Sequence, residues 1–133
     1  MTLKINPKTP IAIKICGITE ASQAKDIAEM GANAIGVIGV AKSPRFVDPL
    51  KRDHIFAELE ASYKSLERVL VVADLNDDQL DFYLNREVRP TIVQLHGNES
   101  KQRCIYLKNK YKQIQWWKAL RIRRKDDLAK IKY

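Results

Sequence analysis

Apolar residues along the chain gather in five short runs, separated by segments whose apolar positions repeat at helical spacing. The runs are IAIKIC, AIGVIGV, RVLVVAD, TIVQLHG and QWWKALRI, beginning at residues 11, 34, 68, 91 and 115. Short runs rich in β-branched or aromatic residues predict strands. Because these strands alternate with helices, the pattern predicts an α/β fold with a parallel sheet covered by helices.

Residues that commonly begin helices precede each helical segment. Thr19, Asp48 and Asn76 are suited to cap the first three helices, and Asn98 or Ser100 the fourth. The apolar faces that we expect to pack on the sheet are, in chain order, Ala21, Ala24, Ile27 and Ala28; Ile55, Phe56, Leu59 and Tyr63; Leu80, Tyr83, Leu84 and Val88; and Cys104, Leu107 and Tyr111.

Five βα units fit two architectures, an open five-stranded α/β sheet or the first five units of an eight-unit barrel. A (β/α)8 barrel needs at least ~200 residues, whereas this chain has 133. The hydrophobic pattern alone leaves both architectures open.

Composition narrows the class of protein. Apolar residues at 45% and charged residues at 30% are typical of a globular protein. We expect no membrane association, since no apolar run approaches the ~18 residues of a membrane span and the first ten residues lack the apolar centre of a secretory signal. Two cysteines make no disulfide framework, so we expect a cytoplasmic protein.

The net charge of +8 is unevenly distributed along the chain. Residues 1–100 carry 12 Lys/Arg and 14 Asp/Glu, a net of −2, whereas residues 101–133 carry 12 and 2, a net of +10. A basic segment raises the question of nucleic acid. The stretch contains no nucleic-acid motif, so we expect no nucleic-acid partner and interpret its first half as the solvent-exposed face of a helix, formed by Lys101, Arg103, Lys108, Lys110 and Lys112.

Four motifs occur in order, each at the C-terminal end of a predicted strand. They are KICGIT at 14–19, GANAIGVIGV with KSPRFV at 31–47, VQLHGNES at 93–100 and WKALRI at 117–122. Together they closely resemble the phosphoribosylanthranilate isomerases of tryptophan biosynthesis, which are compact TIM-type (β/α)8 barrels. The resemblance implies that residues 11–133 form a partial barrel domain of about five parallel βα units, preceded by a flexible extension, residues 1–10.

The resemblance also implies a reaction and the residues that perform it. In this family N-(5-phosphoribosyl)anthranilate becomes 1-(o-carboxyphenylamino)-1-deoxyribulose 5-phosphate by an acid–base Amadori rearrangement, without a metal or organic cofactor. The cysteine of the KICG motif is the general base, which assigns that role to Cys16. Arg45 then faces the anthranilate carboxylate, and His96 lines the pocket for this phosphorylated small-molecule substrate.

Reasoning from the residues supports a functional Cys16. Strand alternation puts Lys14 and Cys16 on one face, into the barrel, and Ile13 and Ile15 on the other, against helices. Barrel enzymes place their chemistry at the C-terminal ends of the strands, where Cys16 lies. A thiol usually has a pKa of about 8.5, so a cysteine base needs positive charge nearby, which Lys14 and Arg45 could supply.

Each site residue also has a purely structural alternative. Cys16 could be a buried, inert cysteine, as we expect for Cys104. Arg45 could be a surface arginine paired with Asp48, and His96 a core histidine with its hydrogen bonds satisfied. No Cys/His spacing resembles a metal site.

Two parts of the family's machinery have no counterpart in the 133 residues. They are the general acid, an aspartate ending the sixth strand, and the phosphate loops after strands seven and eight. Asp126 and Asp127 fit helix N-terminal charges instead. We therefore expect the chain to be incomplete as a catalyst and to self-associate through open sheet edges. The alternative is an inactive barrel remnant that binds or assembles through its basic C-terminal third.

Overall fold

One parallel sheet organises the computed structural model, which describes residues 11–131. Its strands are β1 (Lys14–Cys16), β2 (Ala34–Ile38), β3 (Glu67–Val72), β4 (Ile92–Leu95) and β5 (Gln115–Lys118), and they lie side by side in that order. Every neighbouring pair is parallel. This sequential order is that of successive βα units, so the predicted fold class is confirmed.

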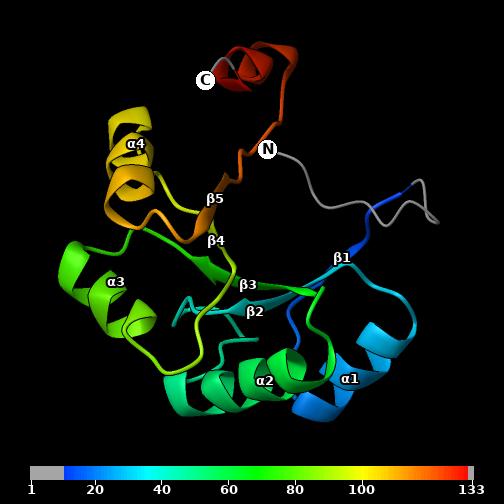
Figure 1. Ribbon diagram of the computed structural model, residues 1–133. Coiled ribbons are helices and arrows are strands. Elements are labelled where there is room, and N and C mark those ends of the chain that lie inside the picture. The colour runs from blue at the N-terminus through cyan, green and yellow to red at the C-terminus, as the bar shows by residue number, and fades with distance from the viewer. Residues whose placement is uncertain (1–10, 132–133) are drawn as a thin grey trace.

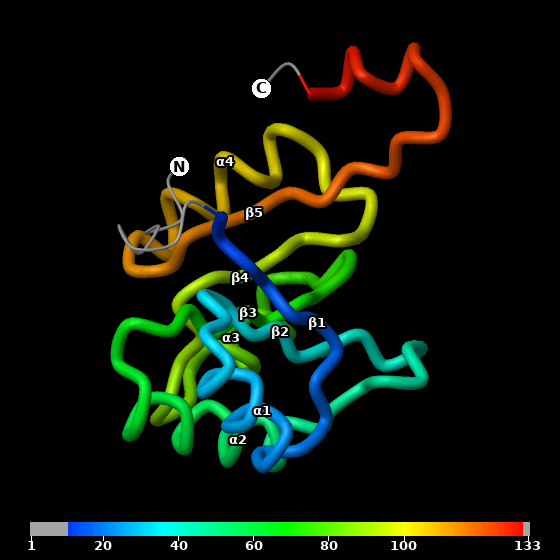
Figure 2. The backbone as a smooth tube through the Cα atoms, turned by 90° about the vertical axis from the view of Figure 1, so that its right-hand side faces the viewer, coloured from blue at the N-terminus to red at the C-terminus, as the bar shows by residue number. Residues whose placement is uncertain are grey.

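Four helices connect the strands: α1 (Ala21–Glu29), α2 (Pro49–Ser62), α3 (Asp77–Leu84) and α4 (Lys101–Lys110). Figure 1 shows them along one side of the curved sheet. After β5 the chain runs away from the strands to a short 3₁₀ helix, η1 (Lys125–Ile131), as the turned view in Figure 2 also shows. The predicted flexible extension, residues 1–10, lies outside the described residues.

Side-chain caps start three of the helices. Asp48 accepts hydrogen bonds from the amides of the first turn of α2. Asn76 forms a capping box with Gln79 at α3. Ser100, rather than Asn98, caps α4. Each cap satisfies amides that have no partner within the helix, so these local signals set where the helices begin.

The predicted cap of α1 is wrong. Glu20 rather than Thr19 occupies the N-cap position, and it makes no side-chain capping bond. The chain stays extended through Glu20, whose carboxylate pairs with Lys51 of α2 instead. The helix ends as expected, before Gly31, which has a φ of +95°.

Alternate strand residues face two apolar layers. The outer layer joins strand residues such as Ile35, Leu70 and Val93 to the helix faces that the spacing predicts. The inner layer lies on the opposite face of the sheet and consists of Ala34, Ile38, Val69, Val71 and Ile92, with Cys16, Val40 and Trp117 packed against them. The prediction that Cys16 faces the inside of the curved sheet is therefore confirmed.

The outer face of β1 differs from expectation. Ile13 and Ile15 were expected to pack on helices, but they are 49% and 38% exposed. β1 is an edge strand, and α1 packs toward α2 and the outer layer rather than over it. Within residues 11–131, the free edges of β1 and β5 have no strand partner.

Two residues of the basic face of α4 make contacts to α3. Lys101, Lys108 and Lys112 are exposed as expected. Arg103 and Lys110 instead contact Asp77 of α3, at 2.5 and 3.1 Å. Hydrogen bonds from Tyr106, Arg103 and Lys110 hold the pKa of Asp77 well below its usual range. Part of the positive charge thus joins α4 to α3. No helix between residues 11 and 131 has the length and apolarity needed to cross a membrane.

Candidate functional site

Cys16 lies at the C-terminal end of β1, with its thiol over a glycine of the neighbouring strand. Cys16 pairs in register with Gly36 of β2. A Cβ at Gly36 would lie 2.8 Å from the Cys16 Sγ and 3.2 Å from the Lys14 Cε. The missing side chain of Gly36 therefore leaves the space that the thiol and the stem of Lys14 share.

The loop after β1 is fixed by two backbone hydrogen bonds to the same oxygen. The amides of Gly17 and Ile18 both donate to the Gly36 carbonyl, at 2.9 and 3.1 Å. Gly17 has a φ of +86°, a conformation that L side chains rarely adopt. The glycine of the KICG motif thus lets the chain turn directly after Cys16.

Arg45 reaches back from the loop between β2 and α2 to this turn. Its Nη1 donates a hydrogen bond to the Cys16 carbonyl oxygen at 3.1 Å. The guanidinium lies where a side chain of residue 17 would be, since a Cβ on Gly17 would be 2.0 Å from Nη1. Gly17 is therefore needed twice, for its backbone conformation and for the room that it leaves to Arg45.

The alternative of an Arg45–Asp48 surface pair is wrong. The Asp48 carboxylate accepts from the amides of Leu50 and Lys51 and so is used as the cap of α2. Among the described residues, the Cys16 carbonyl is the one recorded hydrogen-bond partner of the Arg45 side chain. The exposed guanidinium keeps donors available for an anion.

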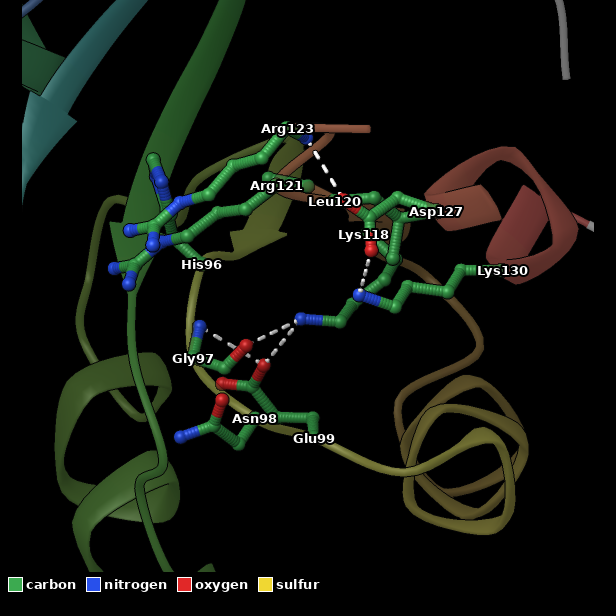
Figure 3. A pocket seen from close by; sticks show the side chains of 11 residues that line it. His96, Gly97, Asn98, Glu99, Lys118, Leu120, Arg121, Arg123, Asp127 and Lys130 are labelled. Atoms are coloured by element: carbon green, nitrogen blue, oxygen red, sulfur yellow. Dashed lines mark hydrogen bonds and ion pairs between the residues drawn. The ribbon is translucent and has the colours of Figure 1, made fainter. Parts of the chain in front are cut away.

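His96 lies one residue beyond β4 and is exposed, so the alternative of a core histidine is wrong. Its backbone amide donates to the Val72 carbonyl at 2.8 Å, which extends the ladder between β3 and β4. The side chain lines a cavity of about 440 Å³ at the C-terminal ends of β4 and β5 (Figure 3). His96 thus lies at the same end of the sheet as Cys16 and Arg45, with no recorded contact to either of them among the described residues.

A buried carboxylate within the VQLHGNES motif, to which the sequence assigns no role, connects the loops at this end of the sheet. The side chain of Glu99 is only 4% exposed. It accepts hydrogen bonds from the Asp74 amide at 2.8 Å, the Gly97 amide at 3.0 Å and the Lys118 ammonium at 2.9 Å. Lys118 also donates to the Gly97 carbonyl at 2.7 Å (Figure 3). Glu99 therefore connects the loops after β3 and β4 with β5.

Asp74 completes this connection from the other side. Its carboxylate accepts from the Asn98 amide at 2.7 Å, and its own φ is +52°. A Cβ on Gly97 would lie 2.5 Å from the Asp74 carboxylate, so the glycine after His96 makes room for it. Reciprocal bonds between the two loops fix the backbone that carries His96.

The charge state of Glu99 follows from these bonds. Burial alone would raise the pKa of Glu99. Hydrogen bonds from the Asp74 amide and the Lys118 ammonium outweigh burial and bring the pKa below its usual value. Glu99 is therefore an anion at neutral pH and a fixed partner for Lys118. Within residues 11–131, no three His, Cys, Asp or Glu side chains are grouped so as to hold a metal ion.

The sequence of this chain matches a known protein family. The family model for N-(5'phosphoribosyl)anthranilate (PRA) isomerase matches residues 13–132. The N-(5'-phosphoribosyl)anthranilate isomerase of Synechococcus elongatus is 38% identical over 119 residues, which are 90% of this chain and 54% of that protein. The chain thus spans about half the length of this curated relative.

The fold also matches solved structures. The phosphoribosyl anthranilate isomerase of Thermotoga maritima is 27% identical and has a TM-score of 0.78, covering 91% of this chain and 56% of its own. A structure of such an isomerase in complex with reduced 1-(o-carboxyphenylamino)-1-deoxyribulose 5-phosphate matches with the same identity and score, covering 91% of this chain and 59% of that one. By the extent of the family match, the chain belongs to the N-(5'-phosphoribosyl)anthranilate isomerase family.

Proposed function

We propose that this chain supplies the general base and the carboxylate-binding residue for the isomerisation of N-(5'-phosphoribosyl)anthranilate, a step of tryptophan biosynthesis. The observation that carries the proposal is the contact between Arg45 and the Cys16 carbonyl. It brings a nucleophilic thiol and an anion-binding guanidinium, from different units of the fold, to one end of the sheet.

The reaction begins with opening of the ribose ring. An acid donates a proton to the ring oxygen as the bond from that oxygen to C1 breaks, and the anilino nitrogen forms a double bond to C1. The Cys16 thiolate then takes the proton from C2, and the electron pair of that bond forms a C1–C2 double bond. The π electrons of the C=N bond return to nitrogen. The resulting enolamine becomes the ketone when a proton adds at C1 and the hydroxyl group on C2 loses its proton to form the carbonyl.

Arg45 and His96 have supporting roles in this proposal. The planar guanidinium fork of Arg45 suits the benzoate carboxylate, which holds the anilino end of the substrate while Cys16 acts on C2. His96 provides a polar contact at the edge of the pocket. The relative whose structure contains a reduced product analogue supports a phosphorylated sugar–anthranilate ligand for the family.

The described residues do not provide the general acid or the phosphate-binding loops that the reaction needs. Between residues 11 and 131, no carboxylate is in recorded contact with Cys16 or with the Arg45 side chain. The resemblance puts both parts in later βα units, and the relatives are nearly twice as long as the matched stretch. We therefore expect the 133 residues to need those units for turnover, since a missing acid–base partner costs about 10²- to 10⁴-fold.

Anthranilate fluorescence follows the reaction directly. The 133-residue polypeptide is assayed alone and together with a polypeptide that carries the remaining units of the Synechococcus elongatus relative, and size-exclusion chromatography establishes whether the two associate. We expect no turnover by either polypeptide alone and turnover by the complex. Turnover by the 133 residues alone would show that another residue supplies the acid. A complex that forms but is inactive would contradict the proposal.

The alternative of a non-catalytic binding module is not favoured, because the relatives are isomerases. Self-association through the free edges of β1 and β5 remains a prediction, which the chromatography of the isolated polypeptide also tests. We place the reaction in the cytoplasm, a proposal supported by two cysteines that are both free thiols.

A further inference from the structure

The cavity beside His96 has an excess of positive charge. Its charged lining residues are Glu99 and Asp127 on the acidic side and Lys118, Arg121, Arg123 and Lys130 on the basic side. Lys118 pairs with Glu99 at 2.9 Å, and Lys130 with Asp127 at 2.6 Å. These two ion pairs cancel, so the surplus consists of the two guanidinium groups of Arg121 and Arg123.

Arg121 and Arg123 project into the same space. They are alternate residues of the irregular segment between β5 and η1, and both line the cavity. In Figure 3 both side chains extend from the backbone in the same direction, toward the side of the cavity on which His96 lies. In the part of the chain that the structure describes, neither guanidinium has a recorded hydrogen bond or ion pair. Within residues 11–131, two permanent like charges thus line one cavity without a recorded acidic partner.

The segment that carries these arginines is held in place by Asp127. Its carboxylate accepts from the backbone amides of Arg123 and Arg124, at 2.8 and 3.0 Å. Hydrogen bonds from Lys130 and from these two amides lower the pKa of Asp127 to about 2. Asp127 is therefore a stable anion that turns the backbone, and this leaves the guanidinium groups directed into the cavity.

We propose that this cavity binds a doubly charged oxyanion of the phosphate class, held by Arg121 and Arg123 with His96 as a third donor. Guanidinium groups bind phosphate oxygens in bidentate geometry, and a dianion neutralises the surplus of two charges. The volume of about 440 Å³ lies within the ~300–1,000 Å³ of small-molecule sites, so the anion can carry an organic group. The cavity shares His96 with the proposed substrate pocket, but Arg45 is not among the residues that line it. Binding of the anion there does not require turnover.

Isothermal titration calorimetry at constant ionic strength and pH 7.5 tests the proposal on the 133-residue protein. The probes are inorganic phosphate and ribose 5-phosphate. We expect one site, and we expect the Arg121→Ala/Arg123→Ala double variant to lose at least ~10-fold in affinity, because it removes the charge-assisted hydrogen bonds of both guanidinium groups. Tighter binding of ribose 5-phosphate would identify a phosphate monoester as the ligand, and equal or weaker binding would identify free phosphate.

A matched control separates a specific site from general attraction to a basic segment. The Arg124→Ala/Lys125→Ala variant also removes two positive charges from this segment, but neither of these residues lines the cavity. We expect it to bind phosphate as the unsubstituted protein does. Equal weakening by both double variants would overturn the proposal, and so would the absence of binding at millimolar phosphate.

A second double variant keeps the test valid if the alanine substitutions disturb the fold. All four substituted side chains are exposed, and circular dichroism checks that the fold is retained. Should the alanine variant misfold, Arg121→Lys/Arg123→Lys keeps both charges but loses the planar fork. Weaker phosphate binding by that variant would support bidentate recognition, whereas unchanged binding would contradict it.

Discussion

Arg45 donates a hydrogen bond from its Nη1 to the carbonyl oxygen of Cys16, 29 positions earlier in the chain, at 3.1 Å. This bond joins the loop after β2 to the end of β1. It therefore positions the backbone of the proposed base and the guanidinium proposed to bind the substrate carboxylate at the same time. The predictions below separate these roles.

Replacing Cys16 should strongly reduce turnover without unfolding the protein. In the complex with the remaining units, we expect Cys16→Ala to lower kcat at least ~100-fold, the usual effect of losing a general base. Cys104→Ala is the matched control, since that thiol packs against the outer layer and burial raises its pKa. Steady-state kinetics compares the two. Comparable turnover in both variants would make Cys16 a packing residue.

Replacing Arg45 should weaken substrate binding more than chemistry. We expect Arg45→Ala to raise KM by about 10- to 100-fold, which corresponds to losing ~1.5–3 kcal/mol of charge-assisted hydrogen bonding. Arg45→Lys keeps the charge but not the fork, so its KM should be intermediate. An unchanged KM in both variants would contradict the carboxylate-binding role.

Adding one methyl group at Gly36 should displace the Cys16 thiol. A Cβ there would lie 2.8 Å from Sγ, closer than nonbonded atoms approach, so the thiol must rotate away from β2 toward the inner face. In a Cys104→Ala background, where one thiol remains, we expect Gly36→Ala to increase the rate of alkylation by iodoacetamide. It should also destabilise the fold by about 1–3 kcal/mol through overpacking. An unchanged alkylation rate would mean that the thiol does not occupy this space.

Glu99→Gln should destabilise the protein in a pH-dependent manner. The substitution removes the negative partner of Lys118, and we expect a loss of about 2 kcal/mol in the free energy of unfolding at pH 7. The pKa of Glu99 is lower in the folded state than in the unfolded chain. Its contribution is therefore fully present above the unfolded value of about 4.3 and is lost as the pH falls through the folded value.

Urea denaturation at pH 7 and at pH 3 measures this difference. The gap between the unsubstituted protein and Glu99→Gln should shrink at the lower pH. Glu87→Gln, an exposed residue with no recorded partner among the described residues, is the control and should change stability by less than ~0.5 kcal/mol at either pH. A gap that is the same at both pH values would contradict the ionic role of Glu99.

The fold could be predicted largely from local patterns. Asp48, Asn76 and Ser100 are recognisable caps because the amides that they bind lie two or three residues further along the chain. Thr19 fits the same pattern, but a distant ion pair between Glu20 and Lys51 accompanies a later start of the helix. Likewise, alternation correctly separates the two faces of β1, but it carries no information on whether a helix covers Ile13 and Ile15.

From the sequence, only those site residues to which the motifs assign a role could be identified. Cys16, Arg45 and His96 lie in recognisable stretches, and their roles remain predictions. Glu99 was missed because its partners, Asp74 and Lys118, lie 25 and 19 positions away and nothing local shows that its side chain is buried. Arg121 lies in the WKALRI motif but was given no role there. Arg123 was counted only as part of a basic segment, because a charge sum does not show which cations already have partners.

The bonds among Asp74, Asn98, Glu99 and Lys118 also limit how this scaffold can be redesigned. Loops of (β/α)8 proteins are attractive targets for grafting because each is attached to the sheet by its own strand and helix. Here the loops after β3 and β4 exchange hydrogen bonds with each other, and β5 supplies the counter-charge. A donor loop inserted after β3 alone would leave a buried carboxylate short of a donor. The two loops and Lys118 therefore form a single module, which has to be transplanted together.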